Sequence, residues 1–167
     1  IFENQIRVGD VAVINGVQGN VEEIRLRTTV LRSVDGTVHV FRNGTINTLA
    51  NMTKDFSYFA MDLPVDYKEN TDRVTQIVRE VAAGMQQDTK YRPSILEPVE
   101  VLGVESFTDA AVTVRFRIKT LPIKQWEVGR EFRRRLKLRL DEEGIEIPAA
   151  YRYMVRAEAQ RRDAAKD

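Results

Sequence analysis

Residues 111–120 read AVTVRFRIKT, and this stretch decides the fold of the C-terminal two thirds of the chain. From position 112 every second residue is apolar, and the residues between them are Thr113, Arg115, Arg117 and Lys119. Successive side chains of a strand point to opposite faces, so this alternation is typical of a half-buried strand. The stretch therefore predicts a strand with one face in a core and one polar face.

Two neighbouring segments add a hairpin partner and a helix to this strand. Residues 99–107 are expected to form the other arm of the hairpin, with residues 108–110 as its turn. Apolar residues recur at every fourth position within 124–143, which predicts a helix with one apolar stripe. Gly144 stands where that helix would take its C-terminal cap, before Pro148.

Upstream, the pattern predicts one more strand and one more helix. Apolar residues alternate along 56–66, which favours a strand, and Asn70 is suited to cap the helix that follows. One face of this helix collects Val74, Ile77, Val78, Val81, Ala82 and Met85. The element order indicates an α+β sandwich with helices on one side of an antiparallel sheet, ferredoxin-like but without its final strand. Residues 145–153 are the candidate for an extra strand, here or in a neighbouring subunit.

The first third of the chain has turn signals at short, regular intervals. Residues that tolerate tight turns occur at Asn15-Gly16, 18–20, Asp35-Gly36 and Asn43-Gly44. The segments between them read as short strands at residues 11–14, 24–30, 37–41 and 46–49. One face of the 24–30 strand is expected to carry Ile24, Leu26, Thr28 and Val30. Strands at this spacing predict a sandwich or a small all-β barrel of the Sm-like or OB-like kind.

The chain is therefore predicted to hold two small domains and a tail. Its length of 167 residues suits one compact domain or two small ones. Residues 1–54 are expected to form the β-barrel domain, and residues 55–153 the ferredoxin-like α/β domain. Residues 154–167 are rich in Ala, Arg and Asp and have no apolar face, so a flexible C-terminal tail is expected.

Composition excludes several kinds of site. The chain has 26 Lys and Arg against 25 Asp and Glu, so no overall charge draws it to nucleic acid or anionic lipid. It has no Cys and one histidine, His39, which excludes a cysteine nucleophile, a cysteine zinc site and a multi-histidine metal cluster. No stretch approaches the roughly 20 apolar residues of a membrane span. We therefore predict no catalytic, cofactor-binding or metal-binding residue.

Several short segments occur in an order that resembles a known family. They are residues 6–10 (IRVGD), 16–22 (GVQGNVE), 27–29 (RTT), Asp35-Gly36, 43–46 (NGTI) and 51–53 (NMT). This set resembles the β-domain that follows the pore helix in channels of the small-conductance mechanosensitive (MscS) family. Residues 144–148 (GIEIP) resemble the stretch that closes the family's C-terminal α/β domain. Two places depart from the pattern. Arg42 stands where the family usually has Pro, and the segment 149–151 (AAY) replaces aromatic and proline residues.

This resemblance implies a part of a channel rather than an enzyme. Family members are similar homoheptamers whose cytoplasmic parts enclose a vestibule pierced by side portals, and the membrane helices would precede Ile1. Tension sensing and the hydrophobic gate would belong to those helices. This chain would contribute ring assembly and the filtering of ions and small solutes released on hypo-osmotic shock. The full-length protein is expected in the cell inner membrane, with this part on the cytoplasmic side and no cofactor.

Other interpretations remain open at this stage. A soluble Sm-like or OB-like nucleic-acid-binding module would share the barrel, but it needs aromatic residues for base stacking. The barrel offers only Phe41 as a clear interior aromatic, so no nucleic-acid partner is expected. The basic run between Arg130 and Arg139 either binds phosphate, faces a portal or is solvated. His39 is a solvent-facing strand residue or a pH-sensitive interface group, and Trp126 anchors a subunit contact or caps its own core.

Overall fold

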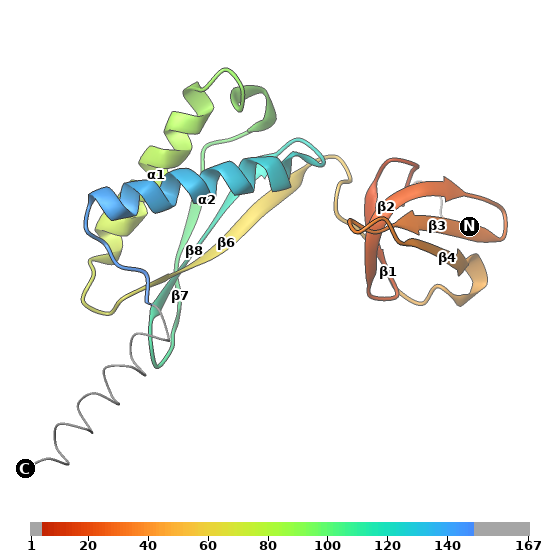
Figure 1. The fold of residues 1–167 in the computed structure, drawn as a ribbon, viewed down its shortest axis with the longest axis horizontal. Coiled ribbons are helices and arrows are strands. Elements are labelled where there is room, and N and C mark those ends of the chain that lie inside the picture. The colour runs from red at the N-terminus through yellow and green to blue at the C-terminus, as the bar shows by residue number, and fades with distance from the viewer. Residues whose placement is uncertain (1–4, 149–167) are drawn as a thin grey trace, which may run out of the picture.

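The structure is a computed structural model that describes residues 5–148, in which two β-sheets and two α-helices are found (Figure 1). The N-terminal sheet curls into a small barrel, and the C-terminal sheet carries both helices (Figure 1). In Figure 1 the barrel lies beyond one end of the α/β unit, and residues 52–56 join the two parts. The chain therefore has the predicted α+β class, with a small β-barrel followed by an α/β sandwich.

The barrel sheet has five antiparallel strands in the order β4-β3-β2-β1-β5. The strands are β1 (Val11–Ile14), β2 (Val17–Ile24), β3 (Thr28–Arg32), β4 (Val38–Arg42) and β5 (Leu49–Asn51). A short 3-10 helix, η1 (Asn43–Thr45), follows β4. The buried core of this unit consists of Ile6, Ala12, Ile14, Val21 and Leu31.

The predicted single strand over residues 24–30 is wrong. The backbone turns between β2 and β3, where Arg25 N donates to Thr28 O at 2.8 Å. Leu26 lies at the tip of this hairpin and is 79% exposed instead of sharing a buried face. The error has a physical cause, since the alternation of apolar and polar residues continues through a tight turn that contains neither Gly nor Asn.

Residues 18–20 are not a turn either, because they lie inside β2. Gly19 is needed there for a different reason than turning. A Cβ at this position would stand 2.8 Å from the backbone oxygen of Arg32 on β3. The glycine therefore permits a close approach of two strands, which is a common role of Gly within a sheet. The last barrel strand also comes later than predicted, at Leu49–Asn51 instead of residues 46–49.

Asn43 fastens the segment after β4 to the β2–β3 hairpin. Its Oδ1 accepts a hydrogen bond from Thr29 Oγ1 at 2.8 Å. Its Nδ2 donates to the carbonyl oxygens of Arg25 and Leu26 at 2.9 and 3.1 Å. Thr29 is fully buried, so the amide oxygen satisfies a hydroxyl that water does not reach. Asn43 thus joins the segment after β4 to the β2–β3 hairpin by three hydrogen bonds.

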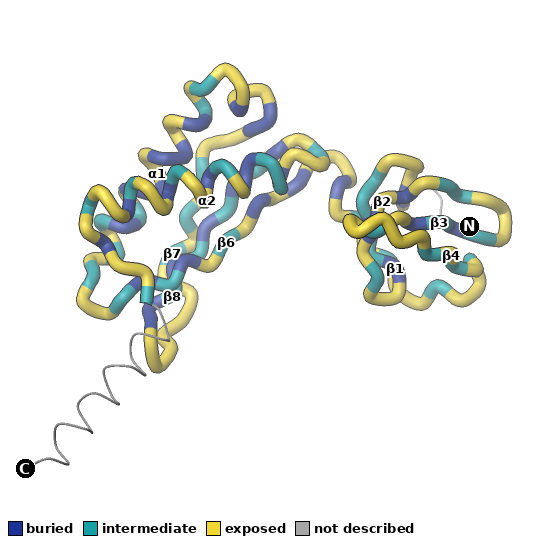
Figure 2. The backbone as a smooth tube through the Cα atoms, in the orientation of Figure 1, coloured by how far each residue is buried: buried dark blue, intermediate teal, exposed yellow. Residues whose placement is uncertain are grey.

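The second sheet has three antiparallel strands in the order β6-β8-β7. They are β6 (Ser57–Val65), β7 (Glu100–Phe107) and β8 (Val112–Thr120), and the helices are α1 (Thr71–Gln87) and α2 (Lys124–Glu142). A short 3-10 helix, η2 (Arg92–Ser94), precedes β7. Burial alternates strictly along β8, as its sequence predicts. Both helices pack against one side of the sheet, and their outer sides are exposed (Figure 2).

The ends of the helices follow the signals in the sequence. The Asn70 side chain accepts hydrogen bonds from the backbone N–H groups of Asp72 and Arg73 at 2.9 and 3.2 Å, which confirms it as the N-cap of α1. Gly144 has φ +70 directly after α2, the left-handed conformation expected of a C-terminal glycine cap. The N-cap of α2 is unusual, because the β-branched Ile123 has φ 71 there.

Part of the predicted C-terminal structure lies outside the described residues. No strand occurs at residues 145–148, and positions 149–153 of the candidate extra strand fall outside the described range, as does the tail at 154–167. Neither α1 nor α2, nor any other helix within residues 5–148, combines the length and apolarity needed to span a bilayer.

Candidate functional site

The face of the second sheet that the helices leave uncovered carries a ladder of ion pairs. Arg115 on β8 binds Asp62 on β6 in a two-pronged contact, with Nε–Oδ1 at 2.6 Å and Nη2–Oδ2 at 2.8 Å, and it also contacts Glu105 on β7. Arg117 pairs with Glu100 at 2.6 Å. The Asp62 carboxylate raises the pKa of Arg115, and the guanidinium lowers the pKa of Asp62. This cross-strand pairing holds the charges in fixed positions.

The ladder continues to the end of β8 nearest the barrel. Lys119 Nζ lies 2.6 Å from Glu97 Oε1 and 4.5 Å from the centroid of the Phe56 ring. The Arg117 guanidinium lies 4.3 Å from the centroid of the Tyr58 ring. These three cations of β8 meet four carboxylates, so the face is a mosaic of both signs with a slight excess of negative charge.

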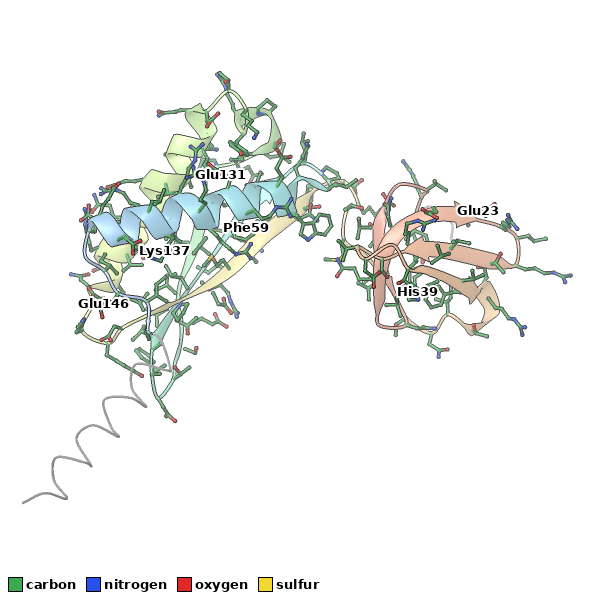
Figure 3. All side chains as sticks on the ribbon, viewed as in Figure 1. Glu23, His39, Phe59, Glu131, Lys137 and Glu146 are labelled. Atoms are coloured by element: carbon green, nitrogen blue, oxygen red, sulfur yellow. The ribbon has the colours of Figure 1, made fainter. Side chains whose placement is uncertain are left out.

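The basic run on α2 is largely neutralised by acidic neighbours. Arg134 and Arg135 both bind Glu131, the residue labelled on α2 in Figure 3, at 2.8 and 2.7 Å. Arg135 also reaches Asp88 at 2.5 Å. Hydrogen bonds from these two arginines lower the pKa of Glu131 to about 2. Further along the helix, Lys137 and Arg139 pair with acidic residues as well, and those partners are Asp141, Glu80 and Glu143. From Arg134 to Arg139 the run is therefore a compensated helical surface, which does not favour a phosphate-binding role for that part, whereas Arg130 has no carboxylate partner among the described residues.

His39 on β4 turns out to be half-buried instead of freely exposed. Its Nε2 lies 2.9 Å from Ser33 Oγ, and its ring stacks on Phe41 with centroids 6.4 Å apart. Within residues 5–148, no three His, Cys, Asp or Glu side chains gather closely enough to hold a metal ion. The contacts of His39 tie together neighbouring parts of the β3–β4 hairpin.

Trp126 is half-buried at the start of α2 and does not belong to the buried core of the α/β unit. It lines an open cavity of about 750 Å³ between the barrel and the first turns of α2. From the barrel side the wall includes Val11 and Val34, and from the α2 side it includes Ile123 and Arg130. The sequence contains no signal for this cavity, because its two walls come from residues about a hundred positions apart.

One backbone carbonyl links the two units beside this cavity. Met52 O, just after β5, accepts a hydrogen bond from Ser57 Oγ at 2.9 Å and a longer one from Gln125 Nε2 at 3.5 Å. Gln125 belongs to the first turn of α2 and is only 6% exposed. The start of α2 is thus tied directly to the end of the barrel.

Two family models match the chain, one for each unit and in the order seen in the structure. Residues 1–54 match the model described as "Mechanosensitive ion channel, beta-domain". Residues 59–147 match the model described as "Mechanosensitive ion channel MscS, C-terminal", and this second match alone covers more than half of the chain.

Curated relatives agree with these matches. The "Small-conductance mechanosensitive channel" of Caldanaerobacter subterraneus subsp. tengcongensis is 33% identical over 148 residues, which is 89% of this chain and 51% of the relative. The "Moderate conductance mechanosensitive channel YbiO" of Escherichia coli is 27% identical over 147 residues, or 88% of this chain and 20% of that protein. The chain thus spans about half the length of the first relative and a fifth of the second.

Solved structures show the same fold. The closed-state crystal structure of Helicobacter pylori MscS matches with a TM-score of 0.69 and 24% identity, over 88% of this chain and 57% of that one. The cryo-EM structure of Arabidopsis thaliana MSL1 matches with a TM-score of 0.59 and 14% identity, over 89% of this chain and 55% of that one. Because the family models cover both units and the identity to a named channel exceeds 30% over nearly the whole chain, the resemblance seen in the short segments is confirmed. The chain belongs to the MscS family of mechanosensitive ion channels.

Proposed function

We propose that this chain is the vestibule part of a tension-gated channel that releases ions and small solutes on hypo-osmotic shock. The main support is that the barrel and the α/β unit occur together, in the family's order, over 88% of the chain in the fold of Helicobacter pylori MscS. In this proposal the membrane helices precede the barrel, in the cell inner membrane, and the vestibule lies on the cytoplasmic side. The division is a β-barrel domain at 1–54, an α/β domain at 55–153 and a tail at 154–167.

The work of the chain in this proposal is assembly and filtering, with no covalent chemistry and no cofactor. Seven copies form a ring around a central space, and solutes enter through openings between the copies. The ion-pair ladder of β6, β7 and β8 suits a wall along which solutes pass, because its charges are fixed and nearly balanced. In this proposal, solutes are selected by the width of the openings and by the charge around them.

No observation favours the nucleic-acid-binding alternative. Among residues 5–54, the barrel has one phenylalanine, Phe41, and neither tyrosine nor tryptophan, whereas sequence-independent binding of single strands relies on stacked aromatic residues. Arg134 and Arg135 in the basic run of α2 are engaged with Glu131 and Asp88, so the run does not form a continuous free cationic stripe. We therefore develop only the channel proposal.

A chimera tests the proposed function. In the gene of the Caldanaerobacter relative, the segment that matches this chain over 148 residues is replaced by the present chain. The chimera is then expressed in bacteria that lack their own mechanosensitive channels. We expect these cells to survive a sudden drop in external osmolarity as well as cells that carry the unaltered relative. Lysis of cells whose membranes contain the same amount of chimera as of the relative would contradict the proposal.

Ring assembly has a separate test. Light scattering gives the molar mass of the 167-residue chain across a concentration series. We expect a mass of seven chains, which would mean that the barrel and the α/β unit suffice to build the ring. A mass of one chain at every concentration would remove ring assembly from the contribution of this part and assign it to the membrane helices.

A further inference from the structure

The open cavity between the barrel and α2 has the size and lining of a small-molecule site. Its volume of about 750 Å³ lies within the range of roughly 300–1,000 Å³ that is usual for ligand pockets. It is formed entirely within one chain. The inference drawn from it goes beyond the proposed function.

Apolar side chains make the larger part of the surface that a ligand would meet. Val34, at the β3–β4 turn, is fully exposed, and Ile123, which lines the cavity from the start of α2, is 49% exposed. The half-buried indole of Trp126 and the side chain of Val11 complete this apolar wall. An aromatic ring that enters the cavity would remove these groups from water, which is the main source of affinity in such sites.

A single cation stands beside this wall without an acidic partner. Within the described chain no carboxylate pairs with Arg130, although it lines the cavity. The acidic residues nearest to it in sequence are engaged elsewhere, Glu127 with Lys124 at 3.1 Å and Glu131 with Arg134 at 2.8 Å. The other arginine of the lining, Arg32, is held by Glu22 and is therefore already neutralised. The cavity consequently carries one uncompensated positive charge.

The indole and the free guanidinium are placed to act together. Trp126 and Arg130 are four residues apart on α2, so their side chains are neighbours on the same face of the helix. An aromatic ring that packs against Trp126 would therefore bring a substituent within reach of Arg130. This arrangement selects a ligand with a flat apolar body and one negatively charged group at its edge.

The backbone at the mouth of the cavity is strained. Ile123 has φ 71, in the left-handed region that β-branched residues rarely adopt. Such conformations persist where the surrounding structure requires them, and they gather at binding sites. Ile123 is one of the residues that line the cavity.

We propose that this cavity binds a small aromatic anion, a ring system that carries one carboxylate or sulfonate. The ring lies between Trp126, Ile123 and Val34, and the acid group pairs with Arg130. The bound ligand contacts both the barrel and α2 and thereby fixes the two units relative to each other.

Trp126 is the only tryptophan of the chain, so its emission reports directly on the cavity. The probe is 8-anilinonaphthalene-1-sulfonate, an aromatic sulfonate, titrated into the folded 167-residue chain at neutral pH. We expect saturable quenching of Trp126 emission with one site per chain. Arg130→Gln is expected to raise the Kd of the probe about tenfold, the loss of one partly shielded ion pair. The charge-matched control Arg79→Gln, on the exposed side of α1, is expected to leave the Kd unchanged.

An uncharged analogue separates charge from shape. N-phenyl-1-naphthylamine has the same rings without the sulfonate, so the unaltered chain and Arg130→Gln should bind it equally well. Equal affinity of both variants for the sulfonate, or the absence of saturable quenching, would overturn the proposal.

Ile123→Gly is a second variant that does not depend on the charge. Glycine adopts positive φ without strain, so folding is expected to be preserved while the apolar wall is lost. The proposal predicts an unchanged or higher melting temperature together with an affinity for the probe several-fold lower. Unchanged affinity in this variant would show that the probe does not bind in the cavity.

Discussion

Gly129 on α2 touches the ring of Phe59 on β6 so closely that position 129 has no room for a side chain. A Cβ there would stand 2.5 Å from Phe59 Cδ2 and 2.7 Å from Phe59 Cε2. The Phe59 ring, labelled in Figure 3, cannot easily turn away, because it also packs against Phe116 and Phe132 with ring centroids 6.5 and 5.9 Å from its own. The absence of a side chain at position 129 thus sets how closely α2 approaches the sheet.

Gly129→Ala is expected to lower the free energy of unfolding by about 1–3 kcal/mol, because the added methyl group overpacks the core. The matched control is Gly84→Ala in α1, where a Cβ would meet nothing within 4 Å. That control is expected to raise the free energy of unfolding by about 0.5–1 kcal/mol, since alanine is the better helix former. Urea denaturation measures both, and a stabilising effect of Gly129→Ala would contradict the packing described.

Asn43→Ala is expected to destabilise the chain by about 1–3 kcal/mol, because it leaves the buried hydroxyl of Thr29 without its acceptor. Asn47→Ala, an exposed asparagine of the neighbouring segment, should stay within about 0.5 kcal/mol of the unaltered chain. In a Thr29→Val background, Asn43→Ala should cost less, since the hydroxyl is already gone. An equal cost in both backgrounds, measured by urea denaturation, would mean that the Thr29–Asn43 bond contributes nothing.

The decrease of the free energy of unfolding at acidic pH is expected to depend on Glu131. Hydrogen bonds from Arg134 and Arg135 hold its pKa at about 2, below its ordinary 4.5. A carboxyl group whose pKa falls on folding stabilises the folded state above its ordinary pKa, and that stability is lost as pH falls through the folded value. Between pH 4.5 and about 2 the free energy of unfolding should therefore decrease less steeply in Glu131→Gln than in the unaltered chain. If the free energy of unfolding fell equally steeply with pH in both proteins, the lowered pKa of Glu131 would be ruled out.

The two side chains that donate to Met52 O are expected to differ in importance. Ser57→Ala should cost about 1 kcal/mol, because it removes a buried hydrogen bond of 2.9 Å. Gln125→Met should change the free energy of unfolding by less than about 0.5 kcal/mol, because the bond it removes is long and the Oε1 of Gln125 has no partner among the described residues. A larger loss of unfolding free energy for Gln125→Met than for Ser57→Ala, measured by urea denaturation, would contradict this ranking of the two hydrogen bonds.

Much of the α/β unit could be predicted from the sequence because its signals are local. The alternation at 111–120 and the caps at Asn70 and Gly144 each depend on neighbouring residues, and the structure confirms all three. In the barrel, the same reasoning joined β2 and β3 into one strand. The alternation of residues around Leu26 carries no mark of the turn that interrupts it.

The functional surfaces could not be predicted in the same way, because they depend on distant pairs. The partners of the basic run, such as Asp88 for Arg135, become neighbours only when α1 and α2 pack. The cavity beside Trp126 likewise needs the barrel and α2 to meet. Only the ordered set of short segments, compared with a family, carried information about function.

The most direct test of the channel proposal is a recording of single-channel currents from membrane patches that contain the chimera with the Caldanaerobacter relative. Suction is applied to each patch while the current is measured, and patches with the unaltered relative serve as the reference. The proposal predicts channels that open with membrane tension and stay closed without it. Patches that contain assembled chimera but show no current at any tension short of rupture, while the relative opens, would contradict it.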